Sequence, residues 1–266
     1  MNISLPVIES RDQEFSHMDQ PRLIPGAEPW AAEGGPTGVL VLHGFTGSPQ
    51  SVRPWGEAIA EKGHTVIVPR LPGHGTSVQD LANFGPSDWV GTAEEALTGL
   101  FERCDRIFVC GLSMGGTLTY DLASRFSDRI AGIVVVNGPV FTKDPRAKLA
   151  PLLGRLNLTL KGVANDIAEP GQSEIAYGKV STRAAGKLIT YMGEVQRRLG
   201  RIHSPALIFT SAQDHVVHPS NGPYILEHIS SSDKRHVTLD RSFHVATLDY
   251  DRHLIFEETI AFIDAH

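Results

Sequence analysis

The clearest candidate for chemistry in this sequence is Ser113, within the run Gly111-Leu-Ser-Met-Gly115. The run follows the apolar segment Ile107–Cys110 and opens a stretch with helical spacing, which predicts a sharp strand-to-helix turn. Such a turn strains the serine backbone and requires small neighbours, which the glycines supply. It lifts the hydroxyl above the sheet beside a helix N-terminus, whose partial positive charge favours an oxyanion. Ser113 is therefore a candidate nucleophile.

A serine hydroxyl is a weak nucleophile without a base, and the base needs an orienting acid. Along the chain, Ser113 is followed first by Asp214, a candidate acid, and then by His244, a candidate base. Each lies just beyond an expected strand, at Ala206–Phe209 and His236–Leu239 respectively. This order at successive strand ends indicates a nucleophile, acid and base.

Other acids are weaker candidates. Asp240 is the nearest competitor, but it lies in or beside the strand that precedes the histidine loop. The strand at Ile133–Val136 ends in Asn137, so no carboxylate occupies that alternative position. We therefore expect Asp214 to be the acid.

The loop after the first apolar strand, His43-Gly-Phe-Thr-Gly47, is expected to supply an oxyanion donor. We expect the backbone N–H of Phe45 to point inward, and the N–H of Met114, one residue after the nucleophile, to complete the oxyanion hole. His43 and His74 are expected to form structural hydrogen bonds that shape their loops.

The elements that must position these residues recur along the chain. Short apolar runs without alternation, each separated by a helical stretch, predict an α/β fold with a doubly wound, mostly parallel sheet. Residues 140–200 interrupt this rhythm with helical fragments and no clear strand, and we expect them to form an inserted cap above the carboxyl ends of the strands. The expected organisation is an N-terminal extension with an edge strand at 1–36, a core at 37–139 and 201–266, and the cap at 140–200.

Composition excludes several classes of function. The 266 residues are 41% hydrophobic, enough for a large core, and their formal charge of −6 argues against a nucleic-acid partner. The sequence has no metal-binding pattern and no glycine-rich nucleotide motif, so we expect no metal and no cofactor. The N-terminus lacks the features of a secretory signal, and Cys104 and Cys110 match no disulfide scaffold. We expect a cytoplasmic protein with reduced thiols.

Several of these motifs closely resemble those of the bacterial monoacylglycerol lipases, which have the α/β-hydrolase fold. The resemblance rests on His43-Gly-Phe-Thr-Gly-Ser-Pro-Gln50, Gly111-Leu-Ser-Met-Gly-Gly116, Asp214-His-Val-Val217 and His244-Val-Ala-Thr-Leu-Asp249. It implies Ser113, Asp214 and His244 as the catalytic residues and Phe45 and Met114 as the oxyanion donors. In that family a cap glutamate contacts the glycerol head, and the segment Ser173-Glu174-Ile-Ala-Tyr177 resembles the one that carries it. The alternative for Glu174 is a solvated helix carboxylate.

The resemblance is weakest at residues 140–162, where basic residues alternate with leucines. This stretch is either an amphipathic lip that contacts an anionic lipid surface or a cap helix that closes an acyl tunnel. We predict a serine hydrolase that cleaves monoacylglycerols, a small-molecule lipid ester, through an acyl-enzyme. The alternatives are a general carboxylesterase for short to medium simple esters and, from another class, a non-catalytic ligand receptor on the same fold.

Overall fold

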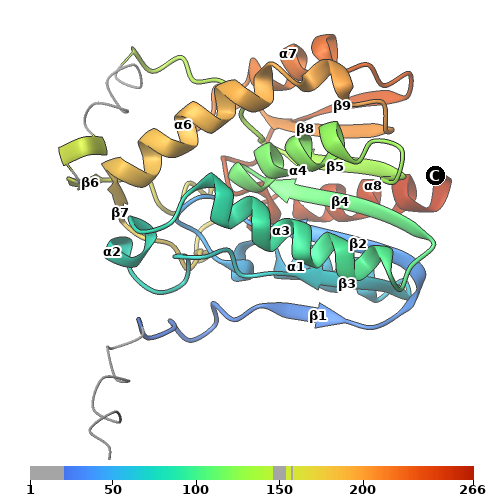
Figure 1. Ribbon diagram of the computed structural model, residues 1–266, viewed down its shortest axis with the longest axis horizontal. Helices are drawn as coiled ribbons and strands as arrows, with labels where there is room; N and C mark the ends of the chain where they lie inside the picture. Colours follow the sequence, from blue (N-terminus) through green and yellow to red (C-terminus); the bar gives the residue numbers. More distant parts are fainter. Residues whose placement is uncertain (1–20, 146–153, 157) are drawn as a thin grey trace, which may run out of the picture.

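The computed structural model describes residues 21–145, 154–156 and 158–266. Within these residues seven strands form one sheet in the order β1-β3-β2-β4-β5-β8-β9 (Figure 1). They are β1 (Trp30–Ala32), β2 (Gly35–Leu42), β3 (His64–Val68), β4 (Arg106–Leu112), β5 (Gly132–Val136), β8 (Ala206–Ser211) and β9 (Lys234–Leu239). All neighbours pair in parallel except β1, which is antiparallel to β3. The doubly wound, mostly parallel sheet that the sequence predicts is confirmed.

Helices cover both faces of this sheet, which is why its strands read as continuous apolar runs. The helices are α1 (Arg53–Ala60), α2 (Val78–Leu81), α3 (Pro86–Phe101), α4 (Met114–Arg125), α6 (Thr182–Gln196), α7 (Asn221–His228) and α8 (Arg252–Ala265). Alternate residues of β2 belong to two separate cores. Leu40 lies in the core that contains Trp89 of α3. Val39 lies in the core that contains Trp55 of α1 and Phe256 of α8. Burial on both faces therefore fixes the register of each strand.

The N-terminal part of the described chain adds one edge strand to the sheet. β1 pairs with β3 through the registers Trp30 with Val68 and Ala32 with Val66. Residues 1–20 of the expected extension lie outside the described part of the chain.

The insertion, residues 140–200, differs from the prediction. It contains two short antiparallel strands, β6 (Thr159–Lys161) and β7 (Lys179–Ser181), where the sequence analysis expects no strand. Three residues each are too few to show a periodic pattern, and β6 is exposed throughout. Figure 1 shows β6, β7 and the start of α6 at the end of the molecule opposite the C-terminus.

Part of the leucine-rich basic stretch within the insertion, residues 146–153 and 157, lies outside the described residues. Of its leucines that are described, Leu156, Leu158 and Leu160 have 63%, 44% and 52% of their surface exposed. Apolar side chains are thus presented to solvent beside β6.

Across the described ranges, every helix is too short or too polar to cross a membrane. Cys104 and Cys110 are free thiols, the first half-buried and the second buried. Burial raises the pKa of the Cys110 thiol, which makes it unreactive. The cytoplasmic location stays a prediction.

Candidate active site

Ser113 lies in a strained turn between β4 and α4. Its backbone has φ 55° and ψ −120°, a region that costs a non-glycine residue of the order of 1–3 kcal/mol. The flanking glycines make the turn fit: a Cβ at Gly115 would lie 2.1 Å from the Leu42 carbonyl oxygen, and one at Gly111 would lie 2.3 Å from the Gly115 carbonyl oxygen. The serine precedes Met114, the first residue of α4, so its hydroxyl is held beside unpaired N–H groups of the first helical turn.

The structure brings Ser113, His244 and Asp214 together. His244 Nε2 lies 2.9 Å from Ser113 Oγ, and His244 Nδ1 lies 2.8 Å from Asp214 Oδ2. The Asp214 side chain is 1% exposed, and its other oxygen accepts hydrogen bonds from the N–H groups of Val216 and Val217 at 2.8 and 2.7 Å. This arrangement can take a proton from the serine hydroxyl and stabilise the resulting imidazolium.

The alternative acid does not take part in this contact. The side chain of Asp240 is exposed, and its carbonyl oxygen accepts a hydrogen bond from the Gln213 side chain at 3.1 Å. The base is therefore paired with Asp214, the acid that chain order favours.

Opposing effects set the protonation of His244. Burial lowers the pKa of this imidazole, but Asp214, Glu174 and Asp166 together outweigh burial and raise the pKa above its usual value. A higher pKa strengthens the base toward the serine proton, at the cost of a smaller neutral fraction in acid.

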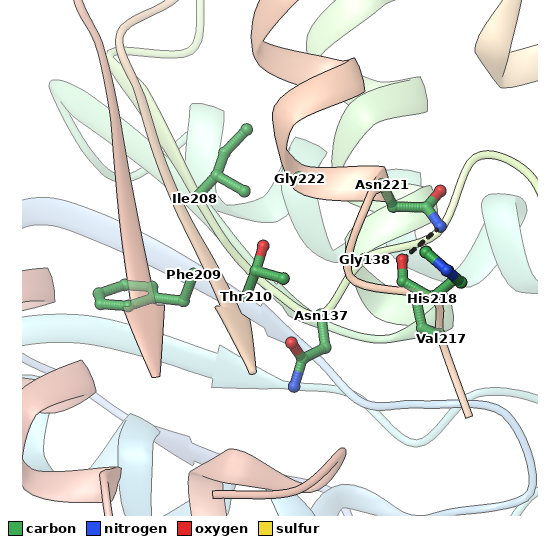
Figure 2. Close-up of a pocket in the computed structure, with 9 residues that line it drawn as sticks. All are labelled: Asn137, Gly138, Ile208, Phe209, Thr210, Val217, His218, Asn221 and Gly222. Carbon is green, nitrogen blue, oxygen red and sulfur yellow. Dashed lines mark hydrogen bonds between the residues drawn. The ribbon is translucent and has the colours of Figure 1, made fainter. Parts of the chain in front are cut away.

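Asn137 supports the histidine from the position where the sequence lacks a carboxylate. Its Nδ2 donates to the His244 carbonyl oxygen at 2.8 Å and to Ser211 Oγ at 2.9 Å, while its Oδ1 accepts from the Ser211 N–H at 2.8 Å. Figure 2 shows Asn137 beside a small cavity that Thr210, His218 and other residues also line. Its volume of about 10 Å³ suits at most one water molecule, so the substrate must bind elsewhere.

His43 shapes the loop that carries Phe45, as the sequence predicts. Burial lowers the pKa of His43 to about 4, so the ring is neutral. Its Nε2 accepts the Leu71 N–H at 3.1 Å, and its Nδ1, which must then carry the proton, donates to the Gly44 carbonyl oxygen at 2.9 Å. A Cβ at Gly44 would lie 3.2 Å from Ser113 Cβ, so this backbone passes directly against the nucleophile.

A larger cavity of about 590 Å³ opens in front of Ser113 and His244. Phe45 and Met114 line it from the core together with Val217 and Val245, and the insertion contributes further apolar side chains. The apolar lining residues from the insertion include Leu160, Val163, Val180, Ala185, Leu188, Ile189 and Met192. A mostly apolar cavity of this size accommodates a chain-bearing ligand.

Glu174 lines this cavity from the insertion, as does Asp144. Its Oε2 lies 3.4 Å from where a Cβ of Gly47 would be, so it faces the oxyanion loop. Gln50 holds the backbone on both sides of it, donating to the Ser173 carbonyl oxygen at 3.2 Å and accepting the Ile175 N–H at 2.9 Å. Burial raises the pKa of Glu174, although a backbone hydrogen bond from Asn165 opposes this.

Asp249 joins the insertion to the loop that carries His244 through hydrogen bonds. This fully buried carboxylate accepts four backbone N–H groups: Oδ2 from Ala168 at 2.7 Å and Phe243 at 2.8 Å, and Oδ1 from Glu169 at 2.9 Å and Tyr250 at 2.8 Å. One side chain thus joins the insertion to the histidine loop, and removing it would leave four N–H groups without this acceptor.

Replacing Asp249 by asparagine should destabilise the protein, because an amide NH₂ would face two of these N–H donors. We expect a loss of about 2–5 kcal/mol of unfolding free energy and a melting temperature lower by roughly 10 °C. Thermal unfolding followed by circular dichroism measures this. The substitution Asp264→Asn at an exposed position serves as the control. A wild-type melting temperature for D249N contradicts the role of Asp249 in holding the two segments together.

Asp166, Asn165 and Gln50 were not predicted as site residues from the sequence. Asp166 and Asn165 lie in an irregular segment, and only the turn-forming Asn-Asp pair marks the position. In the part of the chain that the structure describes, no group of three His, Cys, Asp or Glu side chains is arranged to hold a metal ion.

Comparison with known proteins gives consistent matches. Residues 37–251 match the family described as serine aminopeptidase, S33. The chain is 46% identical over 250 residues to a thermostable monoacylglycerol lipase from Bacillus sp. strain H-257, covering 93% of this chain and 98% of that protein. It is 28% identical over 240 residues to a carboxylesterase from Bacillus subtilis strain 168, covering 89% and 96% respectively.

A solved structure reported for the metagenome-derived lipolytic enzymes LipS and LipT is similar to this fold. Its TM-score is 0.90 at 43% sequence identity, and the match covers 92% of this chain and 100% of that one. These similarities confirm the resemblance drawn from the sequence motifs and confirm the α/β-hydrolase fold.

Proposed function

Because the chain belongs to the family described as serine aminopeptidase, S33, and has the α/β-hydrolase fold, we propose that it is a serine hydrolase that cleaves monoacylglycerols into fatty acid and glycerol. The observation that carries the proposal is the contact of Ser113 with His244 and of His244 with Asp214, beside an apolar cavity of about 590 Å³. The 46% identical monoacylglycerol lipase supports the choice of ester.

In the proposed mechanism the first half-reaction forms an acyl-enzyme. His244 Nε2 takes the Ser113 proton as Oγ attacks the ester carbonyl, and Asp214 stabilises the imidazolium. The N–H groups of Phe45 and Met114 hold the oxyanion of the tetrahedral intermediate. The intermediate collapses as the carbon–oxygen bond to glycerol breaks, and the imidazolium protonates the departing glycerol oxygen.

Water completes the cycle. His244 removes a proton from a water molecule as it attacks the acyl carbonyl, and the second tetrahedral intermediate expels Ser113 Oγ, which regains its proton from His244. The products are a free fatty acid and the unmodified enzyme. In this account the acyl chain lies against the apolar side chains from the insertion, and Glu174 accepts hydrogen bonds from glycerol hydroxyls.

We also propose that residues 140–200 act as a cap over the core formed by 37–139 and 201–266. Leu160 and Val163 support this role, because both line the cavity while 52% and 60% of their surface remains exposed. Exposed apolar side chains at a cavity mouth suit transient contact with a lipid surface, from which the substrate enters.

Replacing Glu174 by glutamine tests the glycerol contact. An amide is a weaker acceptor than a carboxylate, so the ratio of kcat/KM for a 1-monoacylglycerol to kcat/KM for the methyl ester of the same acid should fall about tenfold. Initial rates of fatty-acid release measure both constants. Glu194→Gln, on the exposed side of α6, is the matched control. If the ratio for E174Q equals the wild-type ratio, Glu174 does not bind glycerol and is the solvated carboxylate of the alternative interpretation.

A further inference from the structure

Asp166 of the insertion binds the backbone of the catalytic histidine. Its side chain is 10% exposed, and its Oδ2 accepts the N–H of His244 at 3.1 Å and the N–H of His215 at 3.2 Å. The carbonyl oxygen of Asp166 accepts the N–H of Val245 at 3.1 Å. Because Asn137 holds the His244 carbonyl oxygen from the core, the residue is fixed from both sides.

The preceding residue, Asn165, binds Glu174. Its Oδ1 accepts the Glu174 N–H at 2.7 Å, and its own N–H lies 3.3 Å from Glu174 Oε1. Asn165 has φ 57°, a left-handed conformation that asparagine tolerates better than most residues. The bend turns two adjacent residues toward two different parts of the site.

We propose that the dipeptide Asn165–Asp166 positions both the catalytic base and the carboxylate that binds the substrate head group. Asp166 is a positioning residue for His244, and Asn165 is a positioning residue for Glu174. The inference rests on the proposed function, since the two residues contact His244 and Glu174 of that same site. The insertion thereby takes part in catalysis as well as covering the cavity.

Asp166 also contributes charge. The carboxylates that face His244 are Asp214 from the loop after β8, and Glu174 and Asp166 from the insertion. His215, which is 57% exposed, faces Asp166 with Nδ1 at 2.8 Å from Oδ1. A carboxylate in this place favours the imidazolium that forms as Ser113 loses its proton.

Two substitutions at position 166 separate geometry from charge. Asp166→Ala removes the acceptor of the His244 N–H, and a small displacement of the base should lower kcat about 10- to 100-fold on glycerides and methyl esters alike. Asp166→Asn keeps an oxygen for both N–H groups and removes the charge, while its NH₂ donates to His215 Nδ1 once that exposed ring carries its proton on Nε2. Without that charge the pKa of His244 falls, its neutral form persists at lower pH, and the acid limb of kcat/KM moves to lower pH.

The measurements are kcat and KM of the full chain on a 1-monoacylglycerol and its methyl ester, from pH 5 to 9. Asp233→Asn is the matched control, because Asp233 pairs with His266 at 3.0 Å, away from the cavity. A D166A variant with wild-type kcat, or a D166N profile that superposes on that of the wild type, overturns the role of Asp166. D166N keeps the test valid even where D166A does not fold.

Asn165→Gly tests the second half of the proposal. Glycine adopts positive φ without strain, so only the acceptor for the Glu174 N–H is lost. The glyceride-to-methyl-ester ratio of kcat/KM should fall about fivefold, through KM for the glyceride. An unchanged ratio overturns this role.

The proposed function fails in a different way. If the proposed function is wrong, the wild-type chain releases no fatty acid from a monoacylglycerol. Failure of the further inference appears only in the position 165 and 166 variants of an active enzyme.

Discussion

Replacing Ser113 by alanine is expected to lower kcat for ester hydrolysis by roughly 10⁶-fold, the loss typical when the serine nucleophile of such a triad is removed. Ser113 Oγ is the atom that attacks the carbonyl, and it is the hydroxyl that lies 2.9 Å from His244 Nε2. The alanine keeps the Cβ and the backbone turn, so the fold should be retained. Fatty-acid release under saturating substrate measures the loss.

Labelling with a fluorophosphonate probe makes this test independent of substrate choice. The wild-type chain should gain one covalent adduct, detected by intact mass, and S113A should gain none. Ser230→Ala, an exposed serine after α7, is the matched control and should label as the wild type does. Covalent labelling retained by S113A would remove Ser113 as the nucleophile.

Replacing Asp214 by asparagine is expected to lower kcat about 10⁴-fold. The N–H groups of Val216 and Val217 hold Oδ1, so the amide oxygen should take that place and leave the NH₂ facing His244 Nδ1. A donor there forces the ring proton onto Nε2, and the base can no longer accept the serine proton.

The variant Asp240→Asn is the matched control for D214N. Its exposed carboxylate does not contact the histidine, so kcat should stay within about twofold of the wild-type value. Circular dichroism on both variants checks that the fold is intact. A larger loss in D240N than in D214N reverses the assignment of the acid.

The residues at strand ends were predictable from the sequence, because three local signals coincide there. Continuous apolar runs mark buried parallel strands, and a residue just beyond such a run must lie at the carboxyl edge of the sheet. Ser113, Asp214 and His244 each satisfy this rule, and the glycines around Ser113 add the turn. Asn137 satisfies it as well, and in the structure it supports the histidine from that edge.

The insertion was less predictable for a physical reason. β6 and β7 are too short for a periodic pattern, and the contacts that matter join residues far apart in sequence. Asp166 binds a residue 78 positions away, and Asp249 binds residues 80 and 81 positions away. A carboxylate in a loop looks the same in the sequence whether it is solvated or accepts buried N–H groups, so only the fold distinguishes the two.

A chain-length series on the wild-type enzyme shows directly whether it is a monoacylglycerol hydrolase. It compares kcat/KM for 1-monoacylglycerols of increasing acyl length with kcat/KM for the methyl and nitrophenyl esters of the same acids. We expect the values to peak at medium or long chains and to favour the glyceride, because the apolar cavity binds the chain and Glu174 binds the glycerol. A peak at short simple esters with glycerides ignored contradicts the account and favours a carboxylesterase, and tight binding without turnover contradicts it in favour of a receptor.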